Sequence, residues 1–335
     1  MGAVTFRWTI FGSVSMCKPF PHFITATVWL AASFFAHAEW PAKVFAPYMY
    51  AGSGDNFQLT HCADTTGQRF FTLAFIIAGP SNYPAWYGKI PMAANFYTNQ
   101  IAAIRGRGGD VIISFGGEGG KELALVETNI VLLQAKYQSV IDAYKFTWLD
   151  FDIEGKALSN TSANQRRNTG LAGLQAANPN LIISYTLPVN PDGIPDDAKN
   201  LLADAAKQGV KVHSANLMVM FFGKEFVGKG KSEGRLGIDS AIKAYEQIQQ
   251  LDPAIQIGLC PCLGKNGSKG EFFTEADART LKAWAEAQSW VCSLSFWSIN
   301  RDAGNNPGKQ SSNTNSEMVQ KPWAFTDIFK TFTAQ

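Results

Sequence analysis

Three carboxylates alternate with apolar residues in one short segment of the chain. Asp150, Asp152 and Glu154 are separated from one another by Phe151 and Ile153. In an extended strand this spacing places the three acids on one face and the two apolar side chains on the other. Neighbouring carboxylates raise one another's pKa, so the group should hold at least one shared proton. The pattern therefore predicts a general acid that is still protonated near neutral pH.

Two other interpretations of these acids are a solvated edge strand and a site for calcium or magnesium. An edge strand is disfavoured because Phe151 and Ile153 need cover. A hard-cation site needs further oxygen ligands from other strand ends, and these are not evident in the sequence. We therefore expect catalysis without a metal or cofactor. Loss of activity in a chelator would instead indicate an unrelated, metal-assisted barrel hydrolase.

Eight short apolar runs supply the strands that must position these acids. They are Val44–Tyr50, Phe71–Ala78, Val111–Phe115, Phe146–Ile153, Leu181–Leu187, Ala215–Phe222, Ile255–Leu263 and Val291–Ile299. The amphipathic stretches between them include Thr128–Tyr144, Ser162–Ala177, Pro195–Gln208, Gly237–Gln250 and Thr274–Ser289. Strand followed by helix, repeated this often, predicts a parallel sheet with helices outside it. We expect a closed α/β (β/α)8 TIM barrel rather than an open doubly wound sheet, with the active site at the carboxyl ends of the strands.

The first 38 residues are typical of a secretory signal peptide. Lys18 precedes an apolar run over residues 23–35, and the small residues Ala36 and Ala38 suit a cleavage site. A buried first helix is the alternative. Translation could begin at Met16, which would remove fifteen residues without affecting the signal. We expect a secreted, extracellular protein whose single catalytic domain covers residues 39–335, with the polar stretch 303–315 forming a loop on the active face.

The charge balance disfavours polyanionic partners. Of the 29 basic residues, Arg7 and Lys18 lie in residues 1–38, so 27 remain against 27 acidic ones. A formally neutral domain lacks the basic excess that binds nucleic acid or anionic membranes. No later segment has the roughly 18 consecutive apolar residues of a membrane span. We expect an uncharged ligand, no nucleic-acid or membrane partner, and a monomer.

Four cysteines follow the predicted signal, namely Cys62, Cys260, Cys262 and Cys292. We interpret them as small buried apolar side chains, because a domain of this size does not need disulfides. A single cross-strand disulfide is the next interpretation. A zinc site is disfavoured because the usual C-x2-C spacing is missing.

The acidic segment resembles the D-x-x-D-x-D-x-E signature of family-18 glycoside hydrolases, the chitinases and their relatives. Its last three acids correspond to Asp150, Asp152 and Glu154. The segment Ser114-Phe115-Gly116-Gly117 is similar to that family's S-x-G-G on strand three. Residues 295–302 and 322–329 resemble the bacterial subgroup. Since the four motifs occur in the expected order, the resemblance covers essentially all of the mature chain.

This resemblance implies a mechanism and a substrate class. Glu154 would be the general acid, and the nucleophile would be the N-acetyl oxygen of the substrate itself, so that configuration is retained. Asp152 would orient the acetamido group and share a proton with Asp150. The implied substrates are chitin or N-acetylglucosamine oligosaccharides joined by β-1,4 linkages. An endo-acting enzyme on N-glycan cores would use the same acids, and the sequence does not distinguish it.

The resemblance also implies residues that contact the sugar. Trp297 would lie beneath the sugar at the cleavage point. Tyr48 and Trp86 are candidates for stacking on pyranose faces, and Trp148 is a weaker candidate. The remaining predicted contacts are Gly116, where backbone would approach the sugar, and Met218, Met220 and Phe222 from strand six.

Two departures from the family pattern bear on activity. Thr147 and Trp148 replace the first aspartate and the glycine of the signature, a change that we treat as mild. Phe221 and Phe222 replace the aspartate and tyrosine that usually follow strand six. Loss of one preorganised hydrogen-bonding group typically costs about 10²–10³ in rate. The alternative function is therefore a catalytically impaired, chitin-binding protein, unless Tyr185 or Asn190 supplies the missing hydrogen bond.

Overall fold

The computed structural model describes residues 39–54, 57–303 and 313–332. The predicted signal peptide, its cleavage site and the alternative start at Met16 lie outside the described residues, as do residues 304–312 of the polar stretch. Within the described part, no helix combines the length and apolar character that crossing a membrane requires.

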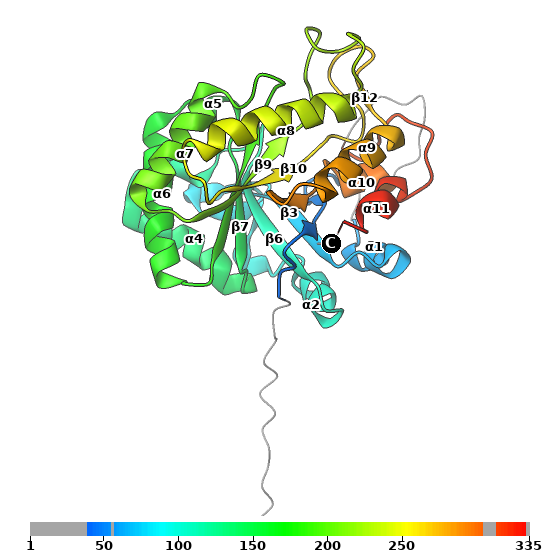
Figure 1. The fold of residues 1–335 in the computed structure, drawn as a ribbon. Coiled ribbons are helices and arrows are strands. Elements are labelled where there is room, and N and C mark those ends of the chain that lie inside the picture. Colours follow the sequence, from blue (N-terminus) through cyan, green and yellow to red (C-terminus); the bar gives the residue numbers. More distant parts are fainter. Residues whose placement is uncertain (1–38, 55–56, 304–312, 333–335) are drawn as a thin grey trace, which may run out of the picture. The chain divides into compact units, whose positions relative to one another are not determined.

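Parallel strands form a closed barrel at the centre of the described residues (Figure 1). The first barrel strand is split into two short pieces, of which the first pairs with the last strand of the chain and the second with the next strand. In barrel order the strands are β1 (Val44–Phe45) with β2 (Tyr48–Tyr50), β3 (Phe70–Ala78), β6 (Asp110–Gly116), β7 (Trp148–Asp152), β8 (Ile182–Pro188), β9 (Val212–Met218), β10 (Gln256–Leu259) and β13 (Val291–Leu294). The eight predicted apolar runs each overlap one of these barrel strands, so the predicted TIM barrel is confirmed.

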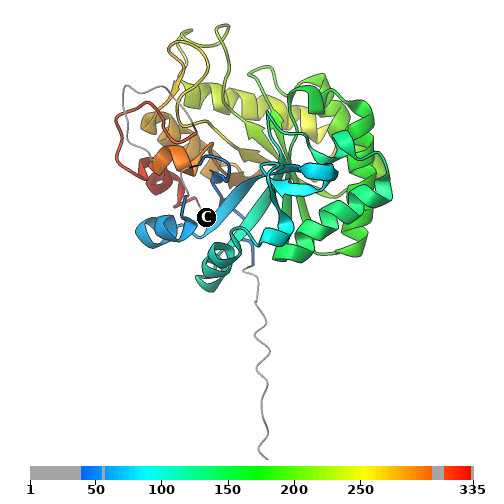
Figure 2. The same ribbon diagram turned by 180° about the vertical axis from the view of Figure 1, so that it is seen from behind.

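Helices surround the strands, as Figure 1 and the reverse view in Figure 2 show. The five predicted amphipathic stretches correspond to α4 (Ile130–Tyr144), α6 (Thr161–Ala177), α7 (Asp196–Gln208), α8 (Glu233–Gln249) and α9 (Glu275–Glu286). The shorter helices are α1 (Leu59–Thr66), α2 (Thr98–Gly106), α3 (Leu123–Val126), α5 (Gly155–Leu158), α10 (Ile299–Ala303) and α11 (Ala324–Phe329). Capping residues set the first residue of two of these helices. Asn129 caps α4, and Thr274 forms a reciprocal capping box with Asp277 at α9.

Two small hairpins extend the barrel at its carboxyl edge. In the first, β4 (Pro84–Trp86) pairs antiparallel with β3 and with β5 (Ile90–Pro91). In the second, β11 (Gly264–Lys265) pairs antiparallel with β12 (Phe272–Phe273). Both hairpins belong to connections that follow barrel strands. They therefore add walls at the end of the barrel where the catalytic residues are expected.

The alternation of acidic and apolar side chains along β7 is the feature that positions the acids. Phe151 stacks on Phe115 of the neighbouring strand with ring centroids 5.1 Å apart, and Tyr137 of α4 packs edge-on against both rings. Because this side of the strand faces the helices, Asp150 and Asp152 face the barrel interior. The predicted orientation of the carboxylates is confirmed by this packing.

Candidate active site

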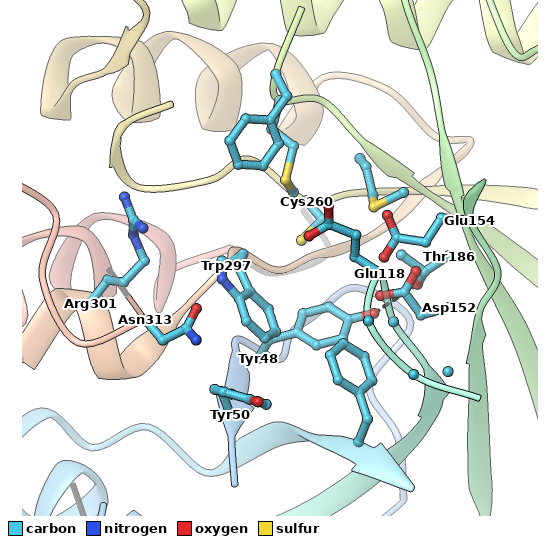
Figure 3. A pocket seen from close by; sticks show the side chains of 18 of the residues that line it. Tyr48, Tyr50, Glu118, Asp152, Glu154, Thr186, Cys260, Trp297, Arg301 and Asn313 are labelled. Atoms are coloured by element: carbon cyan, nitrogen blue, oxygen red, sulfur yellow. Dashed lines mark hydrogen bonds between the residues drawn. The ribbon is translucent and has the colours of Figure 1, made fainter. Parts of the chain in front are cut away.

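A pocket of about 980 Å³ opens at the carboxyl ends of the barrel strands (Figure 3). Its lining includes Asp152, the last residue of β7, and Glu154, which comes two residues later. Asp150 lies deeper, in the barrel interior, and is 2% exposed. The structure therefore brings the three predicted catalytic residues together, with Asp152 and Glu154 in the pocket lining and Asp150 buried in the barrel interior.

Asp150 is surrounded by hydroxyl donors. Its Oδ2 accepts hydrogen bonds from the Tyr48 hydroxyl at 2.9 Å and the Ser114 hydroxyl at 2.7 Å. Its Oδ1 accepts from Ser184 Oγ at 2.8 Å and Thr186 Oγ1 at 2.9 Å. Burial raises the pKa of Asp150, and these four donors oppose that rise by stabilising the carboxylate. Asp150 is thus held in place from neighbouring strands by donors that favour its charged form.

Asp152 has a different environment. It is 5% exposed, and its Oδ1 has no hydrogen-bond partner among the described residues. Burial, followed by the nearby carboxylates of Glu154 and Asp150, raises the pKa of Asp152 well above its ordinary value. The result is a protonated or proton-sharing carboxyl group on a residue that lines the pocket, with one buried oxygen that has no partner among the described residues.

Glu154 lies two residues after Asp152 and is partly buried. Burial is the main cause that raises its pKa to about 7, the Glu118 carboxylate adds to the rise, and a hydrogen bond with Asp152 opposes it. The pocket cations do not neutralise it: Lys265 pairs with Glu317, and Arg301 donates to the Leu263 carbonyl oxygen. Glu154 can therefore hold a proton near neutral pH and release it to a bound molecule.

Aromatic rings form the opposite part of the pocket. Trp297 is half-buried, stacks on Phe75 with centroids 5.6 Å apart, and lies 5.5 Å from the Tyr50 ring. Tyr48 also lines the pocket, 6.1 Å from Trp297, while its hydroxyl bonds to Asp150. The structure places Trp297 and Tyr48 in the pocket, where the sequence predicts contact with a bound sugar. Tyr48 is 2% exposed, which leaves little of its ring for stacking.

The segment after strand six corrects the prediction for Phe222. Met218 and Met220 line the pocket as predicted, but the third lining residue from this segment is Phe221, which is 54% exposed. Phe222 is 2% exposed and packs into the core. The cause is that β9 ends at Met218, and Phe221 then adopts a left-handed backbone with φ of 54°. Simple alternation of side chains no longer holds there.

Trp86 is a second correction, because the structure places it outside the pocket. It is fully buried, and its indole N–H donates to the Tyr144 hydroxyl at 2.9 Å. Its ring packs edge-on against Phe96 and Tyr97. Since β4 adds antiparallel to β3, Trp86 faces α4 instead of the pocket.

Three further candidates also lie away from the pocket lining. Trp148 is in the barrel interior beneath Asp150 and donates to Ser184 Oγ at 3.0 Å. Tyr185 faces the helices and donates to Asn168. Asn190 pairs with Gly193 in a turn. Neither Tyr185 nor Asn190 is therefore placed to replace the family's aspartate and tyrosine.

The glycine-rich segment after β6 fits tightly against β7. The Gly117 N–H donates to the Asp152 carbonyl oxygen at 3.0 Å. Gly116 lines the pocket, has φ of 99°, and a Cβ there would lie 2.1 Å from the same oxygen. Only glycine fits this close approach of two backbones.

Sequence reasoning missed several lining residues. Glu118, Thr186 and Cys260 lie among the residues around the acids, and Asn266 and Asn313 lie farther along the pocket. Thr186 could have been predicted, because side chains alternate along β8 and Thr186 therefore lies on the same face as Ser184. The others come from loops, or from a strand end where no motif marks them.

The four described cysteines are buried and free, so the expectation of small buried side chains is confirmed and no disulfide joins them. Cys260 is the member of this group that lines the pocket. Among residues 39–54, 57–303 and 313–332, no group of three or more histidine, cysteine, aspartate or glutamate side chains is arranged to hold a metal ion.

No family model matches this chain. In sequence it is 29% identical over 316 residues to a probable bifunctional chitinase/lysozyme of Escherichia coli, and 29% identical over 281 residues to endochitinase 11 of Metarhizium anisopliae. The aligned part of the chain spans 35% and 53% of the lengths of these relatives.

A solved structure matches over nearly its whole length. The structure of active domain 2 of the chitinase from Pyrococcus furiosus aligns with a TM-score of 0.79 and 31% identity. The alignment covers 88% of this chain and 96% of that domain, which has also been solved in complex with chito-oligosaccharides. A family-18 chitinase from a fern, at 17% identity and a TM-score of 0.54, shares the fold.

Proposed function

This chain belongs to the family-18 glycoside hydrolases, and from that premise we propose that it is a chitinase. The reaction is hydrolysis of β-1,4 linkages between N-acetylglucosamine units of chitin or its oligosaccharides, with Glu154 as general acid. The single observation that carries the proposal is the pair of adjacent acids in the pocket. Glu154 has a pKa raised to about 7, and Asp152 beside it keeps one unpartnered buried oxygen.

In the first step, Glu154 gives its proton to the glycosidic oxygen as the bond from that oxygen to C1 breaks. The carbonyl oxygen of the substrate's 2-acetamido group forms the new bond to C1 and closes an oxazolinium ion. The carboxyl group of Asp152, which lines the pocket, accepts a hydrogen bond from the acetamido N–H, and this bond orients the carbonyl oxygen toward C1. Substrate assistance accounts for the absence of a second nucleophilic carboxylate from this scheme.

In the second step, a water molecule attacks C1 and the oxazolinium ring opens. Glu154, now a carboxylate, accepts a proton from that water and returns to its starting state. Two successive inversions at C1 give net retention. Asp150 remains a positioning residue in both steps, because its oxygens are already occupied by four hydroxyl donors.

A second candidate function is supported by one specific observation. Phe221 lines the pocket where the family has an aspartate, so an apolar ring replaces a group that would hydrogen-bond the substrate. Under this alternative the protein binds chitin oligosaccharides but has lost most of its turnover.

The test is mass spectrometry of a soluble chitin hexamer incubated with the wild type, with Glu154→Gln, and with Glu225→Gln as an exposed control outside the pocket. We expect cleavage by the wild type and the control, and a rate about 10²–10⁴ lower for Glu154→Gln. Equal rates for wild type and Glu154→Gln would remove Glu154 from the role of acid. An intact hexamer in every tube, together with binding detected by calorimetry, would establish the binding protein instead.

We also propose that the enzyme is exported, on the basis of the apolar run at residues 23–35 and the small residues after it. Protein recovered from the culture medium should begin near Glu39. A chain that stays inside the expressing cells with residues 1–38 intact would contradict this part of the proposal.

A further inference from the structure

Glu118 is a carboxylate that the proposed mechanism does not use. It lies at the centre of a tight turn in which the Gly120 N–H donates to the Gly117 carbonyl oxygen at 3.2 Å. A Cβ on Gly117 would lie 2.6 Å from the Phe75 ring, and one on Gly120 would lie 2.5 Å from the Gly116 carbonyl oxygen. Because the turn fits closely against its surroundings, Glu118 is presented at a defined place on the pocket wall.

No structural contact accounts for the charge at this position. Glu118 is exposed, and among the described residues its side chain has neither a hydrogen bond nor an ion pair. Its charge opposes ionisation of Glu154, whose pKa it helps to raise. A third carboxylate next to Asp152 and Glu154 therefore adds repulsion within the pocket, and a bound cation would relieve it.

The pocket is asymmetric in charge. Figure 3 shows Glu118, Asp152 and Glu154 on one side of Trp297, with Arg301 and Asn313 on the other. The two lining cations are already engaged, Lys265 with Glu317 and Arg301 with backbone carbonyl oxygens. A positively charged group on the ligand would therefore be attracted to the side that holds Glu118.

We propose that Glu118 is a specificity-determining residue that binds the ammonium group of an N-deacetylated glucosamine unit on the leaving-group side of the cleaved bond. This inference rests on the proposed function, because it takes Glu154 as the group that protonates the leaving oxygen. The unit on the other side of the bond must keep its acetyl group, since that group is the nucleophile. The favoured cleavage site is thus an acetylated unit followed by a deacetylated one.

The experiment compares products from partly N-deacetylated chitin cut by the wild type, by Glu118→Gln, and by Glu225→Gln as a control with the same loss of charge outside the pocket. Tandem mass spectrometry gives the ratio of deacetylated to acetylated units at the new non-reducing ends. Both kinds of site compete in one tube, so a change in overall rate cancels from this ratio.

We expect the wild type and Glu225→Gln to enrich deacetylated units at these ends about two- to fivefold over Glu118→Gln, the range for an ion pair open to solvent. The enrichment should shrink in 1 M salt, where charges are screened within about 3 Å. Equal ratios for wild type and Glu118→Gln, or enrichment only on the reducing-end side of the cut, would overturn the inference.

Failure of the proposed function has a separate signature. If the wild type cleaves neither this polymer nor the fully acetylated hexamer, calorimetry of acetylated and partly deacetylated hexamers decides the role of Glu118. A preference of the wild type for the deacetylated hexamer that Glu118→Gln loses would keep the inference for a binding protein. The same preference in both proteins would overturn it.

Discussion

Glu122 and the two pocket acids, Asp152 and Glu154, have opposite surroundings. Glu122, which is fully buried, accepts hydrogen bonds from Arg167 Nε at 3.0 Å and Nη2 at 2.7 Å, and from the Tyr137 hydroxyl. Asp152, which is 5% exposed, has no cation among the groups that shift its pKa and keeps an unpartnered oxygen. The groups that shift the pKa of Glu154 are likewise carboxyl groups.

This contrast shows how the fold separates structural from reactive acids. A buried ion pair with complete hydrogen bonding keeps its charge and holds a loop to a helix, here the start of α3 to α6. A buried carboxyl group without a cation avoids its charge by keeping a proton. The same residue type is therefore an anchor in the first setting and a proton donor in the second.

The largest expected effect comes from breaking the ion pair between Arg167 and Glu122. Arg167→Met leaves Glu122 buried without a cation, and the free energy of unfolding should fall by about 3–5 kcal/mol, as measured by urea denaturation. The double variant Arg167→Met with Glu122→Gln should recover part of the loss, because it removes the uncompensated charge. A single variant as stable as the wild type would mean that the pair does not anchor this side of the barrel.

Replacing a pocket carboxyl group should change stability in the opposite direction. Glu154→Gln removes a carboxylate whose folded-state pKa is about 7 against an ordinary value of 4.5. Because the folded state holds this proton more tightly, stability of the wild type falls as pH rises from about 4.5 to 7 and then levels off. At pH 8 the variant should be more stable by about 1–3 kcal/mol, and at pH 4 it should show no advantage.

Thermal unfolding at the two pH values, with Glu225→Gln as an exposed reference, measures this difference. A variant that loses stability at pH 8 would show that the Glu154 carboxylate has a partner that stabilises it, and the contrast with Glu122 would disappear.

The smallest expected effect concerns Phe221 in the pocket lining. Phe221→Asp restores the family's carboxylate at a position that lines the pocket, and we expect about a tenfold rise in turnover. The matched control is Phe222→Tyr, which changes a buried neighbour and should give no gain. A gain from the control alone would show that the family's aspartate and tyrosine correspond to other positions in this chain.

The regular part of the fold could be predicted from the sequence. Apolar runs separated by amphipathic stretches specify strands and helices through local periodicity, and the right-handed connection of parallel strands leads from these to a barrel. The acids on β7 could be predicted for the same reason. Within a strand the direction of each side chain follows from its position, so the alternation with Phe151 is enough to turn Asp150 and Asp152 toward the interior.

The barrel and the inward direction of Asp150 and Asp152 could be predicted from the sequence, because both depend on short-range periodicity. Tertiary structure alone decided that Phe221 lines the pocket while Phe222 is buried, and that Trp86 faces α4. Both outcomes follow from backbone that leaves the regular strand pattern, through a left-handed residue in one case and an added antiparallel strand in the other. The unpaired charge of Glu118 was equally hidden, since the absence of a partner among the described residues is a property of the folded surroundings and not of any motif.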